Sequence, residues 1–150
     1  GITADKQTLL TLSVTEDELL GIGGENMAGF YASMKYFQSL DNPNNAEFVK
    51  AFKAKYGSDA VIGDVTQAAY LGPWLWKAAV EKAGSFDVDK VVAASAGLEL
   101  NTAPEGYVKV HENQHLWSKT RIGQVQANGQ FQVVYESDLI EPNPFPKGYQ

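Results

Sequence analysis

Residues 41–57 read DNPNNAEFVKAFKAKYG, and this stretch specifies one complete amphipathic helix. Asn42 is a favourable N-cap, and Pro43 suits the first helical position, where no backbone N–H is needed. Apolar side chains then recur at helical spacing, at Phe48, Val49, Phe52 and Tyr56. Gly57 supplies a C-terminal stop. The pattern predicts a helix that begins after Asn42 and ends before Gly57.

Two more helices are predicted after this one. Residues 68–83 carry a stripe of small and apolar side chains that ends at Gly84. Pro73 lies inside the stripe and is expected to bend this helix or to mark its start. Asp87 is the N-cap of a third helix, which runs to about Gly97.

The two ends of the chain have β character. Residues 7–14 predict a short buried strand, which stops at a Thr15–Glu18 capping box, and residues 27–37 predict a second strand. Residues 107–110 predict a third. The last strands, 120–126 and 130–136, flank an Asn-Gly turn. The order of elements predicts a mixed α/β chain.

Pairing across Asn128-Gly129 places Ile122 opposite Tyr135 and Gln126 opposite Phe131. One face of this hairpin is then expected to be buried; it carries Ile122, Phe131, Val133 and Tyr135.

Composition excludes several classes of function. The net charge is −6 and the basic residues are scattered, which argues against a nucleic-acid footprint and against an anionic membrane surface. The chain has no cysteine, so disulfides, thiolate metal sites and cysteine nucleophiles are excluded. It has no apolar run long enough for membrane insertion, and its first residues do not resemble a signal peptide, which we expect upstream.

One motif invites a catalytic interpretation. His111-Glu112-Asn113-Gln114-His115 matches the His-Glu-x-x-His pattern of zinc metallopeptidases, with Glu136 or Glu141 as a third ligand. That chemistry needs a helix, because only a helix places histidines four residues apart on one face. The segment follows a β-like stretch and lacks an N-cap and an apolar stripe. A surface loop is therefore predicted, with no catalytic or metal-binding residue, and the peptidase remains a remote alternative.

Several stretches resemble the type I periplasmic binding proteins of the branched-chain amino acid and amide group. They are residues 45–57, residues 68–72 and residues 79–84. Others look closer to the urea and short-chain amide branch: residues 13–19, 21–23, 103–106, 113–117, 122–125 and 129–131. Relatives commonly carry Asp-Pro where this chain has Val110-His111, so the histidine motif looks accidental.

The resemblance implies part of a two-lobed type I periplasmic-binding-protein fold, with helices packed on a mostly parallel sheet and a C-terminal β-hairpin. Family members are more than twice as long, so residues 1–150 are expected to be a C-terminal portion. Residues 1 to about 26 and 103–150 are expected in the C-terminal lobe, and about 38–100 in the N-terminal lobe. A homodimer is one way in which such a portion would complete its missing strands.

The implied function is the extracytoplasmic substrate-binding component of an ABC transporter, which captures urea or a short-chain amide and delivers it to the permease. No enzymatic activity and no cofactor are implied. The alternatives are a branched-chain amino acid binding protein, an amide-sensing regulatory domain, and a receptor-type ligand-sensing domain.

Four residues are the candidate ligand contacts. Glu16 follows a strand, where open α/β sheets bind ligands, and a glutamate near this place contacts the ligand amine in amino-acid-binding relatives. Its alternative role is to stabilise the start of the next helical turn. Ser13 and Thr15 are candidate donors to a ligand oxygen, although Thr15 also suits a helix cap. Tyr70 lines either the cleft or the core.

Overall fold

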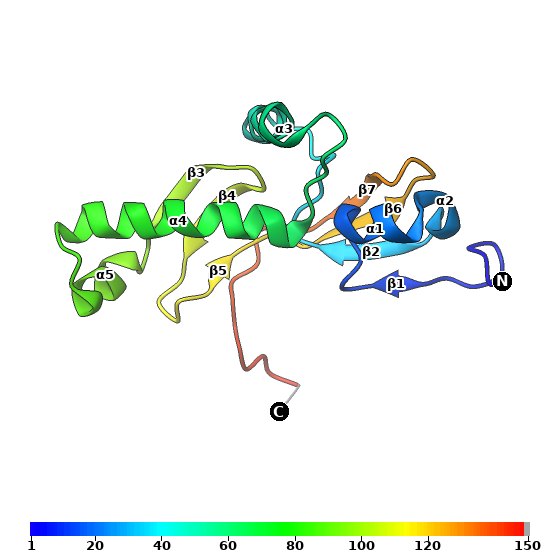
Figure 1. Ribbon diagram of the computed structural model, residues 1–150. Helices are drawn as coiled ribbons and strands as arrows, with labels where there is room; N and C mark the ends of the chain where they lie inside the picture. Colours follow the sequence, from blue (N-terminus) through cyan, green and yellow to red (C-terminus); the bar gives the residue numbers. More distant parts are fainter. Residues whose placement is uncertain (149–150) are drawn as a thin grey trace.

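The computed structural model describes residues 1–148, and its elements fall into two halves (Figure 1). The sheet half contains β1 (Leu10–Thr11), α1 (Glu16–Ile22), α2 (Gly24–Met27), β2 (Tyr31–Met34), β6 (Arg121–Val125) and β7 (Phe131–Glu136). The helical half contains α3 (Pro43–Tyr56), α4 (Asp64–Ala83), α5 (Val88–Ser95), β3 (Glu99–Ala103), β4 (Gly106–Val110) and β5 (Leu116–Trp117). Among the described residues, no helix is both long and apolar enough to cross a membrane.

The α/β class is confirmed, but neither sheet is mostly parallel. The first sheet has the order β1-β2-β6-β7, in which only β1 and β2 run parallel. The second has the order β3-β4-β5 and is antiparallel throughout. The reason is connectivity: tight turns join β3 to β4 and β6 to β7, and a tight turn can only produce antiparallel neighbours.

The helix starts are where the capping residues predicted them. Asn42 Oδ1 accepts a hydrogen bond from Asn45 N at 2.9 Å, and Pro43 occupies the first turn of α3. The capping box at Thr15 is also present, and α1 continues to Ile22 before Gly23 ends it. Asp87 Oδ1 caps α5 through Lys90 N at 3.1 Å. Pro73 lies inside α4, which starts at Asp64.

The N-terminus of α4 is capped by a residue from α1. Its own N-cap is Gly63, which has no side chain to offer. Asp17 Oδ2 instead accepts from Gly63 N at 3.0 Å and from the Thr66 hydroxyl at 3.2 Å. A Cβ at Gly63 would clash with Thr15 Oγ1 and Asp17 Oδ2, so only glycine permits this approach. Asp17 therefore ties the two halves together.

Replacing Asp17 by Ala is expected to lower the free energy of unfolding by about 1–2 kcal/mol, because the start of α4 loses its acceptor and a favourable negative charge. Guanidinium denaturation followed by circular dichroism measures this change. Asp5→Ala, at an exposed position near the chain start, is the control. Equal midpoints for the two variants would contradict the capping role.

The apolar core is divided into three clusters. The first lies in the sheet half and contains Leu19, Ala32, Phe37, Val125 and Phe131. The second packs α3 against the connectors, through Tyr36, Phe48 and Ile62. The third packs α4 against β3 and β4, through Leu71, Ala103 and Val108. Each half thus has its own buried apolar centre.

Three predictions about β structure are wrong in part. Of the expected strand 27–37, only Tyr31–Met34 is a strand, and Met27 belongs to α2. Only Leu10–Thr11 of the expected strand 7–14 is a strand, and Leu9, Leu10 and Leu12 are exposed. β1 is also the edge strand of its sheet. In the hairpin, Ile122 pairs with Tyr135 as predicted, but Val125 rather than Gln126 pairs with Phe131.

A register shift between Ile122 and Gly123 causes this difference. It moves Tyr135 off the buried face, where it was expected, and leaves it 54 % exposed. Phe131 is buried as predicted, and Gly123 leaves room for the rings of Phe37 and Phe131 above it.

The predicted lobe boundaries stay a prediction, and the arrangement in Figure 1 bears on them. The connector after β2 leads out of the sheet half, and residues 118–120 lead back into it. Residues 103–117 belong to β3–β5 and pack with α4, so they lie with the helical elements rather than with residues 1–26. Residues 149 and 150 of the predicted segment 103–150 lie outside the described residues.

Candidate functional site

Glu16 is the first residue of α1 and is almost completely buried, with 1 % of its surface exposed. Its Oε1 accepts a hydrogen bond from Gln38 N at 2.8 Å. Its Oε2 is buried and has no hydrogen-bond partner within residues 1–148. An unpaired buried polar atom costs about 1–3 kcal/mol, so once the carboxyl is ionised this oxygen is a strong acceptor for any N–H donor that reaches it.

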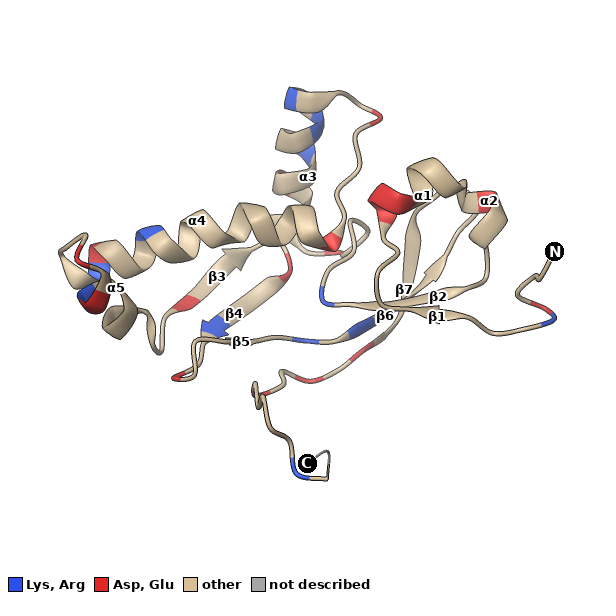
Figure 2. Ribbon diagram, turned by 60° about the horizontal axis from the view of Figure 1, so that its bottom comes forward, with Lys and Arg blue, Asp and Glu red and all other residues tan. Residues whose placement is uncertain are grey.

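The surroundings of Glu16 are acidic. Burial raises the pKa of the Glu16 carboxyl to about 7. Hydrogen bonds from the backbone N–H groups of Glu16 and Gln38 lower this pKa, whereas the negative charges of Asp17 and Asp64 raise it. Within the described chain, no lysine or arginine forms an ion pair with this carboxyl. Figure 2 shows the acidic first turn of α1 facing the start of α4. The site therefore favours donors over anions.

A small cavity of about 210 Å³ opens beside Glu16. Its walls are α1, the start of α2, Val61 and the β6–β7 turn at residues 127–130. Gln38 connects two walls of this cavity by hydrogen bonds. Its Nε2 donates to Gln130 Oε1 at 3.0 Å, and its Oε1 accepts from Ile62 N, next to Val61, at 2.9 Å. The cavity is large enough for a ligand of a few heavy atoms and is bordered by fixed polar groups.

Tyr36 extends this polar region towards α3. Burial, with Glu16 and Asp64 nearby, raises the pKa of its hydroxyl, which therefore stays protonated. The hydroxyl donates to Asn45 Oδ1 at 2.7 Å, and Asn45 Nδ2 donates to the carbonyls of Gln38 and Leu40. These bonds fix the connector that carries the Gln38 N–H.

The structure does not gather the four predicted residues into one site. Ser13 is exposed and does not line the cavity beside Glu16. Thr15 is buried, but its hydroxyl donates to Glu18 Oε2 at 2.8 Å within the capping box. The ligand-binding roles of Ser13 and Thr15 stay predictions.

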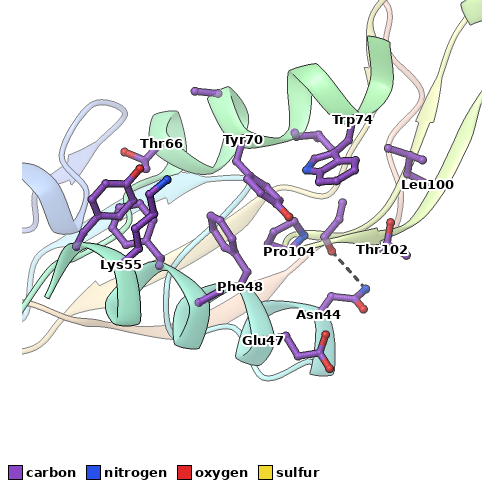
Figure 3. Close-up of a pocket in the computed structure, with 16 residues that line it drawn as sticks. Asn44, Glu47, Phe48, Lys55, Thr66, Tyr70, Trp74, Leu100, Thr102 and Pro104 are labelled. Atoms are coloured by element: carbon purple, nitrogen blue, oxygen red, sulfur yellow. Dashed lines mark hydrogen bonds between the residues drawn. The ribbon is translucent and has the colours of Figure 1, made fainter. Parts of the chain in front are cut away.

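Tyr70 lies in a different place, an open groove of about 810 Å³ between α3 and α4 (Figure 3). Its ring is 4.4 Å from that of Phe48 and 6.0 Å from that of Trp74. Figure 3 shows these rings pointing into the groove from the two helices. No residue is shared between this lining and the Glu16 cavity. Tyr70 therefore lies apart from Glu16, and its ligand-binding role stays a prediction.

Sequence reasoning missed two residues that build the site. Neither Gln38 nor Asp17 was among the candidate ligand contacts. Asp17 is one residue from Glu16 at a helix start, a position that allows its carboxylate to reach a second helix N-terminus. Gln38 gave no signal, because its role depends on contacts with residues 24 and 92 positions away.

The histidine motif lies in the loop between β4 and β5, as predicted. His111 N donates to His115 O at 2.8 Å, which closes a turn instead of a helix. His111 Nε2 lies 3.2 Å from Glu141 Oε1, one of the nominated third ligands. His115 Nδ1 contacts the carbonyl of Asn113. Across residues 1–148, no group of three or more metal-binding side chains forms.

An α/β chain in two halves, with a buried polar acceptor beside a small cavity, is typical of a ligand-binding domain. The chain belongs to the periplasmic binding proteins: the family model described as "Periplasmic binding protein domain" matches residues 1–150. Members of this family are extracytoplasmic substrate-binding proteins of ABC transporters.

Solved structures with the same fold include three solute-binding proteins. An amino acid ABC transporter substrate-binding protein from Pseudomonas fluorescens has a TM-score of 0.77 and 22 % identity, over 93 % of this chain and 39 % of that one. A solute-binding protein from Rhodopseudomonas palustris in complex with p-hydroxybenzoic acid has a TM-score of 0.74 and 27 % identity, over 94 % of this chain and 39 % of that one. A leucine-binding protein from Thermotoga maritima has a TM-score of 0.67 and 25 % identity, over 79 % of this chain and 33 % of that one.

One curated relative carries an enzyme name. Limonene hydroxylase from Geobacillus stearothermophilus is 35 % identical over 121 residues, which are 81 % of this chain and 22 % of that protein. The chain thus spans about a fifth of this relative and between a third and two-fifths of the three solved structures.

Proposed function

We propose that the chain is the C-terminal part of the substrate-binding component of an ABC transporter that captures urea or a short-chain amide and delivers it to the permease. The observation that carries the proposal is the buried carboxyl of Glu16, with one free oxygen beside a small cavity. Urea and short amides are small, neutral and rich in N–H donors, which suits this acceptor.

The acidity of the site argues against anionic ligands. A benzoate-type carboxylate placed in this cavity would face Glu16, with Asp17 and Asp64 close by. Like charges at short range in a buried site are strongly unfavourable. A neutral amide avoids this repulsion and supplies the missing hydrogen bond.

The second candidate is a branched-chain amino acid binding protein. A leucine-binding protein is among the structural neighbours, and the ammonium group of an amino acid also donates to a carboxylate. An amide-sensing regulatory domain would use the same site chemistry. A cytoplasmic location with a regulatory partner would identify that third alternative.

Calorimetric titration of the full-length protein with urea, acetamide, leucine and benzoate tests the proposal. Saturable one-to-one heat with urea or acetamide, and none with leucine or benzoate, is expected. Binding of leucine alone would move the function to amino acid uptake. Binding of benzoate alone would contradict the proposed role of the Glu16 site.

Above pH 7, where the Glu16 carboxyl is ionised, Glu16→Gln is expected to weaken binding of urea or acetamide by about tenfold or more, which is the size of one lost charge-assisted hydrogen bond. Titration calorimetry measures the change. Glu18→Gln is the matched control, because it lies in the same helical turn and glutamine also completes a capping box. Unchanged affinity in Glu16→Gln would remove Glu16 from the site.

A further inference from the structure

The contacts between the two halves of the chain differ in kind from the contacts within them. The three apolar clusters lie inside the sheet half, around α3, and between α4 and β3–β4. None of them joins the first sheet to the α4 layer in the described chain. Interfaces of this polar kind within a chain allow relative movement, whereas apolar cores resist it.

Lys35 is the cation at this junction. It follows the end of β2, and its ammonium reaches two residues of the helical half. Its Nζ lies 3.3 Å from Gln67 Oε1 on α4 and 3.7 Å from Glu105 Oε1 in the β3–β4 turn. The Lys35 side chain is 28 % exposed, whereas that of Glu105 is 3 % exposed.

Arg121 fixes both partners of this pair from the sheet half. Its guanidinium donates to the Lys35 carbonyl and, at 3.0 Å, to the Glu105 carbonyl. It is itself held by Glu136, whose Oε2 accepts from Arg121 Nε at 2.7 Å. Ser118 adds a hydrogen bond to Glu105 Oε2 at 3.3 Å. The Lys35 and Glu105 backbones are thus anchored on one rigid side chain.

Hydrogen bonding at this junction is incomplete. Gln67 is fully buried, yet its Nε2 has no partner among residues 1–148, and Glu105 Oε1 accepts no hydrogen bond there. Water would satisfy both groups if the halves moved apart. The observed arrangement therefore depends on the Lys35 ammonium, which forms an ion pair with the Glu105 carboxylate.

We propose that Lys35 is a positioning residue that sets the angle between the two halves through its ion pair with Glu105 and its hydrogen bond to Gln67. A long cation is required at this position, because the ammonium must bridge from β2 to both α4 and the β3–β4 turn. Loss of the charge leaves Glu105 without compensation and favours a more open arrangement, in which water hydrates its carboxylate.

The absence of cysteine makes a direct distance measurement practical. Cysteines introduced at the exposed positions Gln132 on β7 and Asp89 on α5 carry one spin label in each half. Pulsed electron paramagnetic resonance then measures the distribution of distances between the two spin labels in the whole protein. Lys35→Met is expected to shift this distribution to longer or broader distances, and Lys35→Arg, which keeps the charge and the reach, is expected to restore it.

Two further variants separate positioning from a general loss of stability. Glu105→Gln is expected to give the same shift as Lys35→Met, and the double variant is expected to give no more than either alone. Lys77→Met removes an exposed ion pair with Glu81 that lies wholly within α4, and it is expected to leave the distribution unchanged. A distribution in Lys35→Met identical to that of the parent protein, or additive shifts in the double variant, would overturn the proposal.

Discussion

Phe131→Ala is expected to lower the free energy of unfolding by about 3–5 kcal/mol, the usual loss for truncating a buried aromatic residue. Phe131 is 2 % exposed and its ring centroid lies 4.7 Å from that of Phe37. It belongs to the cluster that joins α1 to the first sheet, with Leu19, Ala32 and Val125. Removing the ring leaves a cavity that the surrounding strands cannot close. Guanidinium denaturation measures the loss; urea is avoided because it is the proposed ligand.

Tyr135→Ala is the matched control on the same strand. The register shift in β6–β7 leaves Tyr135 54 % exposed, so its truncation is expected to change stability by no more than about 0.5 kcal/mol. The uninterrupted register that the turn alone predicts would bury both rings on one face. A loss in Tyr135→Ala as large as that in Phe131→Ala would contradict the observed register.

The protein is expected to lose stability as the pH rises from about 4.5 to about 7, through the titration of Glu16. Over this range the folded carboxyl keeps its proton, because burial raises its pKa, whereas the unfolded carboxyl has lost it. The unfolded state binds fewer protons, so the free energy of unfolding falls with rising pH. The contribution of Glu16 amounts to roughly 3 kcal/mol across the whole window.

Comparison with Glu16→Gln isolates this contribution from the other titrating groups. Glutamine has no proton to lose here and still offers Oε1 to the Gln38 N–H, so the variant is expected to have a flatter stability profile and a relative gain above pH 7. Glu18→Gln is expected to keep the slope of the parent protein. Parallel profiles for the parent protein and Glu16→Gln would show that the buried carboxyl does not titrate in this window.

The helices could be predicted because their signals are local. Asn42, Asp87 and Thr15 each cap a helix through backbone groups no more than three residues away. Capping and helical spacing depend on neighbours in the chain, which a sequence displays directly. The start of α4 is the exception: its cap comes from Asp17, 46 residues earlier, and no local pattern marks it.

Only part of the candidate site could be predicted from the sequence. Glu16 was identified from its place after a strand, and the structure shows a buried carboxyl beside a cavity. Tyr70 was grouped with it, but the structure places Tyr70 in the groove between α3 and α4. The free Oε2 of Glu16 was not predictable, because hydrogen-bond satisfaction depends on every residue that packs around the carboxyl.

By itself, the sequence determined the α/β class, the starts of α1, α3 and α5, and the hairpin turn at Asn128-Gly129, and it predicted a loop rather than a helix at His111–His115. The tertiary structure alone decided the mixed sheet, the exposure of Tyr135, the cap that Asp17 provides and the Lys35–Glu105 pair. The physical reason is range. Backbone propensity and capping act over a few residues, whereas burial, register and ion pairing are properties of segments that the folded chain brings together.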